Sequence, residues 1–153
     1  MKFILLDIDG VMVPASGWKP VECESDGFYK FNKVSQDCLI NLISESNANI
    51  VLISSHKNRF TSEVWFDIFK RRIPNLKSIS IIDDIVSTKI SDKYKQILEW
   101  DIEYGHNKYV IIDDDRTLFM YPENIKSHWV KTDSLIGLNS EKMIESIKIL
   151  NNA

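Results

Sequence analysis

The chain has 153 residues, of which 44% are hydrophobic and 27% are charged, and its formal net charge is −3. This composition is typical of a soluble globular protein, and the length favours one domain, over residues 1–153, with a substantial core. The slightly negative net charge excludes a positive field over the whole protein that would attract nucleic acid, although it is compatible with a local basic patch. Two cysteines, Cys23 and Cys38, are too few for a disulfide framework or a closed zinc site.

The first apolar run is short, because it stops at Asp7. A run of this length predicts neither a signal peptide nor a membrane span. We therefore expect a cytoplasmic protein that makes no contact with a membrane.

Five short apolar runs rich in β-branched residues predict the strands of a sheet. They lie at residues 3–6, 50–53, 79–82, 109–112 and about 127–130. Apolar runs without polar alternation are typical of strands that are covered on both faces, and hence of a parallel sheet.

Four helical patterns lie between and after these runs. Their expected first residues or caps are Ser35, Thr61 or Ser62, Ser91, and Asn139 or Ser140. Strands that alternate with helices indicate an α/β fold, a three-layer Rossmann-like arrangement in which about five parallel strands carry helices on both faces. Trp65 and Trp100 fall on the apolar sides of two of these helices and are expected in the core.

Residues 11–34 do not follow this alternation, since they contain two prolines and two glycines before the aromatic run at residues 28–31. We expect an irregular flap or hairpin over the carboxyl edge of the sheet. Its Trp18 could stack on a base or a substrate, or simply pack. No other insertion is long enough for a large cap domain.

The first predicted strand ends in Asp7 and Asp9, which are followed by Gly10. Alternate residues of an extended strand point to opposite faces, so both acids reach one pocket only if the chain bends after Asp7. Gly10 offers the freedom for that bend. The pair suits a carboxylate nucleophile beside a carboxylate that transfers protons.

Further polar residues follow other strands or begin a helix. Ser54 and Ser55 come after the second strand, Lys93 lies in a first helical turn, and residues 113–115 are three successive aspartates. Parallel strands end at one edge of the sheet, so we expect these side chains to converge with Asp7. Several acids in one place need a cation, and an all-oxygen set completed by a phosphate suits Mg²⁺.

These motifs make the chain similar to the haloacid dehalogenase (HAD) superfamily of phosphotransferases. Asp7-Ile8-Asp9-Gly10-Val11 matches the first motif, Ser54 the second, Lys93 the third and Asp113-Asp114 the fourth. The chain further resembles the small HAD domains of bacterial and viral RNA-repair proteins of the Swiss-army-knife type. The stretches that carry this second likeness are Trp65, the Lys93 to Trp100 spacing, Thr132-Asp133 and Gly137-Leu138-Asn139. One departure is Ser55-His56-Lys57, where that group often has Ser-Trp-Arg.

The resemblance implies a role for each matched residue. Asp7 would attack phosphorus and become an aspartyl-phosphate, and Asp9 would exchange protons with the leaving oxygen and the water. Ser54 and Ser55 would contact the phosphate, which Lys93 would neutralise. The metal ligands would be Asp7, the backbone carbonyl of Asp9, and Asp113 and Asp114, without a choice between the last two as the direct ligand.

Neighbouring residues have simpler interpretations. We expect Asp115 to cap a helix or to be solvated, and His56 to be structural or peripheral. Lys57 and Arg59 could touch a phosphodiester backbone, but exposed charge is the commoner explanation. The cations at residues 70–72 end a helix, so we favour an interaction with the helix dipole over a role in nucleic-acid binding.

The sequence thus predicts a Mg²⁺-dependent phosphatase that hydrolyses a phosphomonoester. Its partner would be a phosphorylated substrate, either a small molecule or a nucleic-acid end, and no protein partner is indicated. Two alternatives stay open: a non-catalytic binding module of the same fold, and a small-metabolite phosphatase with a lid that a partner supplies.

Overall fold

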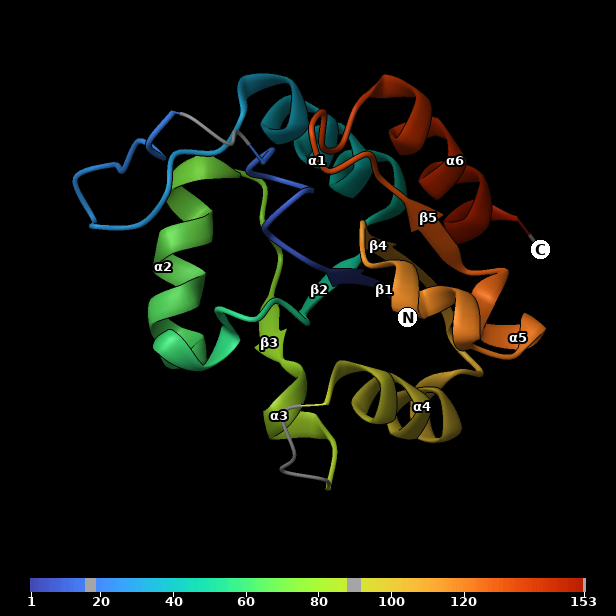
Figure 1. Cartoon of the computed structure of the whole chain (residues 1–153). Helices are drawn as coiled ribbons and strands as arrows, with labels where there is room; N and C mark the ends of the chain where they lie inside the picture. Colours follow the sequence, from blue (N-terminus) through green and yellow to red (C-terminus); the bar gives the residue numbers. More distant parts are fainter. Residues whose placement is uncertain (16–18, 88–91, 153) are drawn as a thin grey trace.

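In the computed structural model of this protein, which describes residues 1–15, 19–87 and 92–152, five strands form one parallel sheet (Figure 1). The strands are β1 (Lys2–Leu6), β2 (Asn49–Leu52), β3 (Ile79–Ile81), β4 (Lys108–Asp113) and β5 (Trp129–Lys131). Their order across the sheet is β3-β2-β1-β4-β5. The parallel α/β sheet predicted from the sequence is confirmed.

The central strand β1 ends level with β2 and one residue before the end of β4. Leu6 pairs with Leu52 of β2 on one side and with Ile112 of β4 on the other. The residues that follow these three positions therefore lie at the same edge of the sheet.

Helices cover both faces of the sheet and give a three-layer architecture (Figure 1). One face carries α1 (Lys33–Ser46), α2 (Ser62–Arg72) and α6 (Ser140–Asn151). The other carries α3 (Ile82–Ile85), α4 (Lys93–Tyr104) and α5 (Glu123–Lys126). Two short 3₁₀ segments, Lys57–Arg59 and Arg116–Met120, lie in the loops after β2 and β4.

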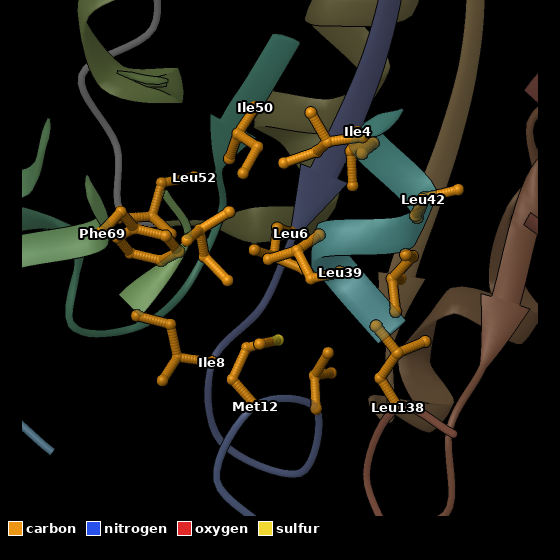
Figure 2. Packing of buried hydrophobic residues seen from close by; sticks show 14 of the residues in the cluster. Ile4, Leu6, Ile8, Met12, Leu39, Leu42, Ile50, Leu52, Phe69 and Leu138 are labelled. Carbon is orange, nitrogen blue, oxygen red and sulfur yellow. The ribbon is translucent and has the colours of Figure 1, made fainter. Parts of the chain in front are cut away.

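Each face has its own apolar core, because successive strand residues point to opposite sides. Ile4 and Leu6 of β1 pack with α1 and α2 (Figure 2), whereas Leu5 packs on the side of α4. Trp65 and Trp100 are fully buried, one in each core, as the sequence predicted.

Several element ends differ from the sequence prediction. Helix α1 begins at Lys33, two residues early, because the Asn32 side chain accepts bonds from the next turn. Asp92 caps α4, and Ser91 lies outside the described residues. Strand β5 begins at Trp129, because Ser127 is the C-cap of α5 and the amide of His128 still donates to the carbonyl of Ile125 in that helix. The short helices α3 and α5 were not predicted.

The flap predicted at residues 11–34 contains a hairpin. Cys23 and Tyr29 form an antiparallel bridge, and the amide of Glu24 donates to the carbonyl of Phe28. Both cysteines of the chain are free, and Trp18 lies outside the described residues. The described residues contain no cap domain, and none of their helices is long and apolar enough to cross a membrane.

Candidate active site

The chain turns sharply after β1, as the two strand-end acids require. The amides of residues 11–13 all donate to the carbonyl of Ile8, over 2.8 to 3.1 Å. Gly10 adopts a φ of +77°, which a residue with a Cβ rarely does. A Cβ at Gly10 would also overlap the carboxylate of Asp114. The glycine therefore permits both the turn and the close approach of Asp114.

A loop from the other end of the chain supports this turn. The Thr132 hydroxyl donates a buried 2.7 Å bond to the carbonyl of Gly10. The amide of Leu138 donates to the carbonyl of Val11, over 2.8 Å. Thr132 and Leu138 are among the residues that resemble the small HAD domains, but the resemblance implies no role for either. Their hydrogen bonds hold the loop that follows Asp7 and Asp9 in place.

Three carboxylates meet beside the ends of β1 and β4. The oxygens of Asp7, Asp113 and Asp114 lie within 4.8 Å of one another, and Asp7 and Asp113 are buried. Burial raises the pKa of Asp7 to about 9, the Asp113 charge adds to this effect, and Lys93 opposes it. Burial and Asp113 also raise the pKa of Asp114. The cluster is thus unfavourable in its ionised form unless positive charge is present.

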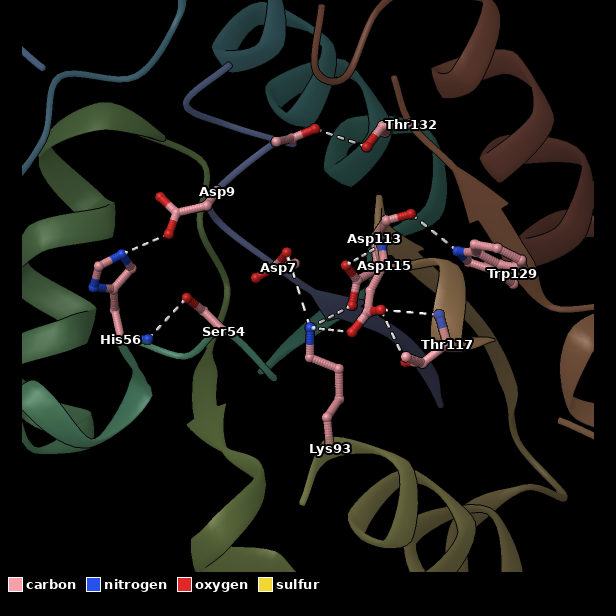
Figure 3. Close-up of polar contacts among 11 residues, drawn as sticks. Asp7, Asp9, Ser54, His56, Lys93, Asp113, Asp115, Thr117, Trp129 and Thr132 are labelled. Atoms are coloured by element: carbon pink, nitrogen blue, oxygen red, sulfur yellow. Dashed lines mark hydrogen bonds and ion pairs between the residues drawn. The ribbon is translucent and has the colours of Figure 1, made fainter. Parts of the chain in front are cut away.

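Lys93 supplies part of that charge from the first turn of α4 (Figure 3). Its ammonium lies 2.8 Å from Asp113, 3.7 Å from Asp115 and 4.0 Å from Asp7. Burial opposes the charge on Lys93, but Asp113 and Asp7 outweigh it and raise the pKa of the amine. One ammonium does not balance three carboxylates. The all-oxygen donor set of Asp7, Asp113 and Asp114 fits a divalent metal ion.

Asp115 has a different task from the two aspartates before it. Its Oδ1 accepts bonds from the amide and the hydroxyl of Thr117, of 2.9 and 2.8 Å, and so caps the segment Arg116–Met120. The cap predicted for Asp115 is confirmed. Asp113 is fixed by the Asp115 amide at one carboxylate oxygen and by the Trp129 indole at its carbonyl.

Ser54 and Ser55 follow β2 but differ in exposure. Ser54 is buried, and its Oγ accepts a 3.1 Å bond from the amide of His56, which leaves the hydroxyl proton for another acceptor. Ser55 is exposed on the turn. Because both serines follow β2, whose last residue Leu52 pairs with Leu6 of β1, they lie at the edge of the sheet where Asp7 lies.

The Asp9 side chain does not join the acidic cluster. It is 56% exposed, and its Oδ2 lies 2.8 Å from Nε2 of His56 (Figure 3). His56, expected to be structural or peripheral, thus contacts the side chain of Asp9 directly. The only signal for this contact in the sequence is weak, namely a histidine two residues after a strand-end serine.

The two cations expected near the site, Lys57 and Arg59, also differ. Lys57 is buried, and its ammonium lies 3.6 Å from the carboxylate of Asp83. The exposed position expected for Lys57 is therefore wrong. Arg59 is exposed, and its guanidinium lies over the rings of Phe28 and Phe60, 5.5 Å from each centroid. Arg59 is thus the cation that remains at the surface beside Asp9 and His56.

A hollow of about 460 Å³ lies at the opposite, amino-terminal edge of the sheet. It is lined by polar and basic residues that include Lys2, Lys77 and Lys108. None of the acids described above lines it, so this hollow is separate from the candidate site.

Comparison with protein families agrees with this geometry. Residues 3–143 match the model of the HAD domain in Swiss Army Knife RNA repair proteins. The chain belongs to this family. Membership indicates a HAD-type hydrolase, and the cluster of Asp7, Asp113 and Asp114 could hold the divalent metal that such domains generally use. Searches among curated proteins and among solved structures gave no match.

Proposed function

We propose that the chain is a Mg²⁺-dependent phosphatase that hydrolyses a phosphomonoester through Asp7. The observation that carries this proposal is the placement of Asp7 4.0 Å from the Lys93 ammonium and within 4.8 Å of carboxylate oxygens of Asp113 and Asp114. Phosphoryl transfer depends mainly on positioning and on neutralising charge. A buried carboxylate beside one cation and a second cation site meets both needs.

In the first step, a carboxylate oxygen of Asp7 attacks phosphorus. The bond from phosphorus to the leaving oxygen breaks, and Asp9 gives that oxygen a proton. In the second step, water attacks phosphorus, Asp9 takes the proton of the water, and the Asp7 carboxylate is released with inorganic phosphate. Asp9 is exposed and so can be reached by both the leaving group and water.

The other residues bind and orient the phosphate. The Ser54 hydroxyl has a proton to donate to a phosphoryl oxygen, and Ser55 on the same turn can add a contact. Lys93 neutralises the phosphate and Asp7 together. Mg²⁺, held by Asp7, Asp113, Asp114 and the Asp9 carbonyl, would stabilise negative charge on the phosphoryl group when bound.

The exposure of the site bears on the class of substrate. Two observations favour a bulky substrate: Asp9 is exposed, and the described residues contain no cap domain that closes over it. Family membership among RNA repair proteins favours a nucleic-acid end. A small phosphate ester is the second candidate, with a lid supplied by a partner.

The test is hydrolysis of 4-nitrophenyl phosphate by the purified chain, with Mg²⁺ and with a chelator. We expect release of phosphate that depends on Mg²⁺ and disappears in Asp7→Asn. Asp37→Asn is the matched control, since Asp37 is an acid on the surface of α1 that pairs with Lys33. Activity equal in the wild type and Asp7→Asn would refute the role of Asp7. Phosphate binding without turnover would instead favour the non-catalytic binding module.

A further inference from the structure

The contact between Asp9 and His56 has no part in the roles given above. It joins the proton-transferring carboxylate to a ring that is mostly buried, over 2.8 Å from Nε2 to Oδ2. The Asp9 side chain itself is more than half exposed. A carboxylate in that setting has several rotamers available unless a partner selects one.

The direction of this hydrogen bond follows from the other side of the ring. Nη1 of Arg59 lies 3.4 Å from Nδ1 of His56. A guanidinium can only donate, so Nδ1 accepts and the ring N–H lies on Nε2. His56 therefore donates to Asp9. Oδ2 of Asp9 is then occupied as an acceptor, and Oδ1 is left to carry a proton.

The flap holds the ring in place. Tyr29 contacts it edge to face at 5.3 Å between centroids, and Phe28 does so at 6.0 Å. The amide of His56 is bound to Ser54, so the backbone is fixed as well. Aromatic pairs of this geometry are worth about 0.5–1.5 kcal/mol beyond the area they bury.

The flap aromatics are in turn attached to α2. Arg72 donates to the carbonyls of Phe28 and Tyr29, over 3.2 and 3.0 Å. Its guanidinium is buried and also binds the Asp26 carboxylate. A continuous set of contacts therefore runs from α2 through the flap and His56 to Asp9.

We propose that His56 is a positioning residue for Asp9. By donating to Oδ2, it selects one orientation of the carboxylate and makes Oδ1 the atom that exchanges protons with the leaving oxygen and with water. This inference rests on the proposed phosphatase function and extends it to a residue outside the four motifs.

The test compares two substrates that differ in their leaving groups. 4-Nitrophenolate leaves without a proton, whereas the alkoxide of β-glycerol phosphate needs one. The ratio kcat/KM covers only the steps up to breakage of the ester bond. In His56→Ala we therefore expect kcat/KM for β-glycerol phosphate to fall about 10- to 100-fold, which is part of the 10²- to 10⁴-fold that acid–base catalysis supplies. We expect kcat/KM for 4-nitrophenyl phosphate to change little.

Three further measurements separate positioning from a general loss of structure. His56→Gln keeps an N–H donor near the place of Nε2, and we expect it to recover most of the kcat/KM for β-glycerol phosphate. The side chain in His56→Asn is too short to reach Asp9. If the Ala variant does not fold, this variant gives the same comparison between the two substrates. His106→Ala is the matched control, because His106 is exposed at the opposite edge of the sheet.

Equal losses for both substrates in a folded His56→Ala variant would overturn the inference, since they would indicate a structural role. No loss, a gain, or a Gln variant as poor as the Ala variant would overturn it too. If the wild type hydrolyses neither substrate, the proposed function fails and the inference falls with it. If Asp7→Asn abolishes activity while His56→Ala is normal, the inference alone fails.

Discussion

The guanidinium of Arg72 donates two hydrogen bonds to the carboxylate of Asp26, of 2.7 and 2.9 Å, across 46 positions of the sequence. Arg72 is buried, and Glu24 lies 3.2 Å from its Nε. Removing one partner of a buried pair leaves the other charge without compensation, which is more costly than losing a surface pair. This contact therefore fixes the flap on α2.

The first prediction concerns that contact. The hydrogen bond from Arg72 lowers the pKa of Asp26 from 3.8 to about 2. A lowered pKa contributes stability above the ordinary value, and this contribution is lost as the pH falls toward 2. At pH 7 we expect Asp26→Asn to lower the free energy of unfolding by about 2 kcal/mol or more.

Urea unfolding at pH 7, 5 and 3 measures this difference, which should shrink at the lowest pH. Asp37→Asn is the control, because the pair of Asp37 and Lys33 is exposed and should be worth at most about 1 kcal/mol. A loss in Asp26→Asn no larger than in the control would show that the buried pair does not stabilise the flap.

The second prediction concerns Asp7 in the absence of metal. Because its pKa is raised from 3.8 to about 9, the folded state keeps a proton that the unfolded state has lost. Stability is then lost as the pH rises between these values. We expect Asp7→Asn, which cannot ionise, to melt at a higher temperature than the wild type at pH 8 in a chelator.

The measurement is thermal unfolding at pH 5 and pH 8, where each kcal/mol corresponds to roughly 2–4 °C for a chain of this size. The advantage of Asp7→Asn should be smaller at pH 5 and should shrink at pH 8 when Mg²⁺ is added. A difference that does not change with pH would mean that ionisation of Asp7 does not limit stability.

The third prediction ranks the aspartates after β4. Asp114 lies in the cluster with Asp7, whereas Asp115 caps the next segment through Thr117. Asp114→Ala should therefore weaken Mg²⁺ binding at least 10-fold, about 1.4 kcal/mol, and Asp115→Ala should weaken it less. Isothermal titration calorimetry with Mg²⁺ gives both affinities. The reverse order would assign the ligand to Asp115.

The centre of the sheet was predictable because its strands are apolar on both faces. The runs in β1, β2 and β4 favour strands that are covered on both faces, and the pairing of Leu6 with Ile112 brings Asp7 and Asp113 to the same edge. At the outer strands the prediction found the strands but not their exact bounds, and it missed the short helices beside them. There β3 and β5 have three residues each and adjoin four-residue helices, which are too short to show a period.

Residues of the site could be predicted where the position of the backbone places them. They could not be predicted where the contact depends on the direction of a side chain. Asp7, Lys93 and Asp114 follow from strand ends and a helix start. The contact of His56 with Asp9, and the burial of Lys57 against Asp83, depend on how loops from different strands pack together. The last turn of α2 suggested a dipole role for Arg72 over nucleic-acid binding, and Arg72 does donate to the carbonyl of Ile68 in that helix. Its partners in the flap could not be read from local pattern.

The last prediction concerns the size of the substrate. The described residues contain no cap domain, and closure over a site is what normally selects small substrates. We therefore expect a 3′-phosphorylated oligonucleotide to have a higher kcat/KM than the matching mononucleotide. Of the cations considered at the sequence level, Lys57 is buried, so Arg59 is the residue expected to contact the nucleic-acid backbone.

The ratio of the two kcat/KM values isolates these contacts, because both substrates need the same chemistry at Asp7. Arg59→Ala should lower the ratio and make it less dependent on salt, by about 0.7 in the slope of log K against log salt for one phosphate contact. Lys77→Ala, at the opposite edge of the sheet, should leave the ratio unchanged. If the mononucleotide is as good or better at low salt, the nucleic-acid end is the wrong substrate class. A small-molecule phosphatase whose lid comes from a partner then accounts better for the open site.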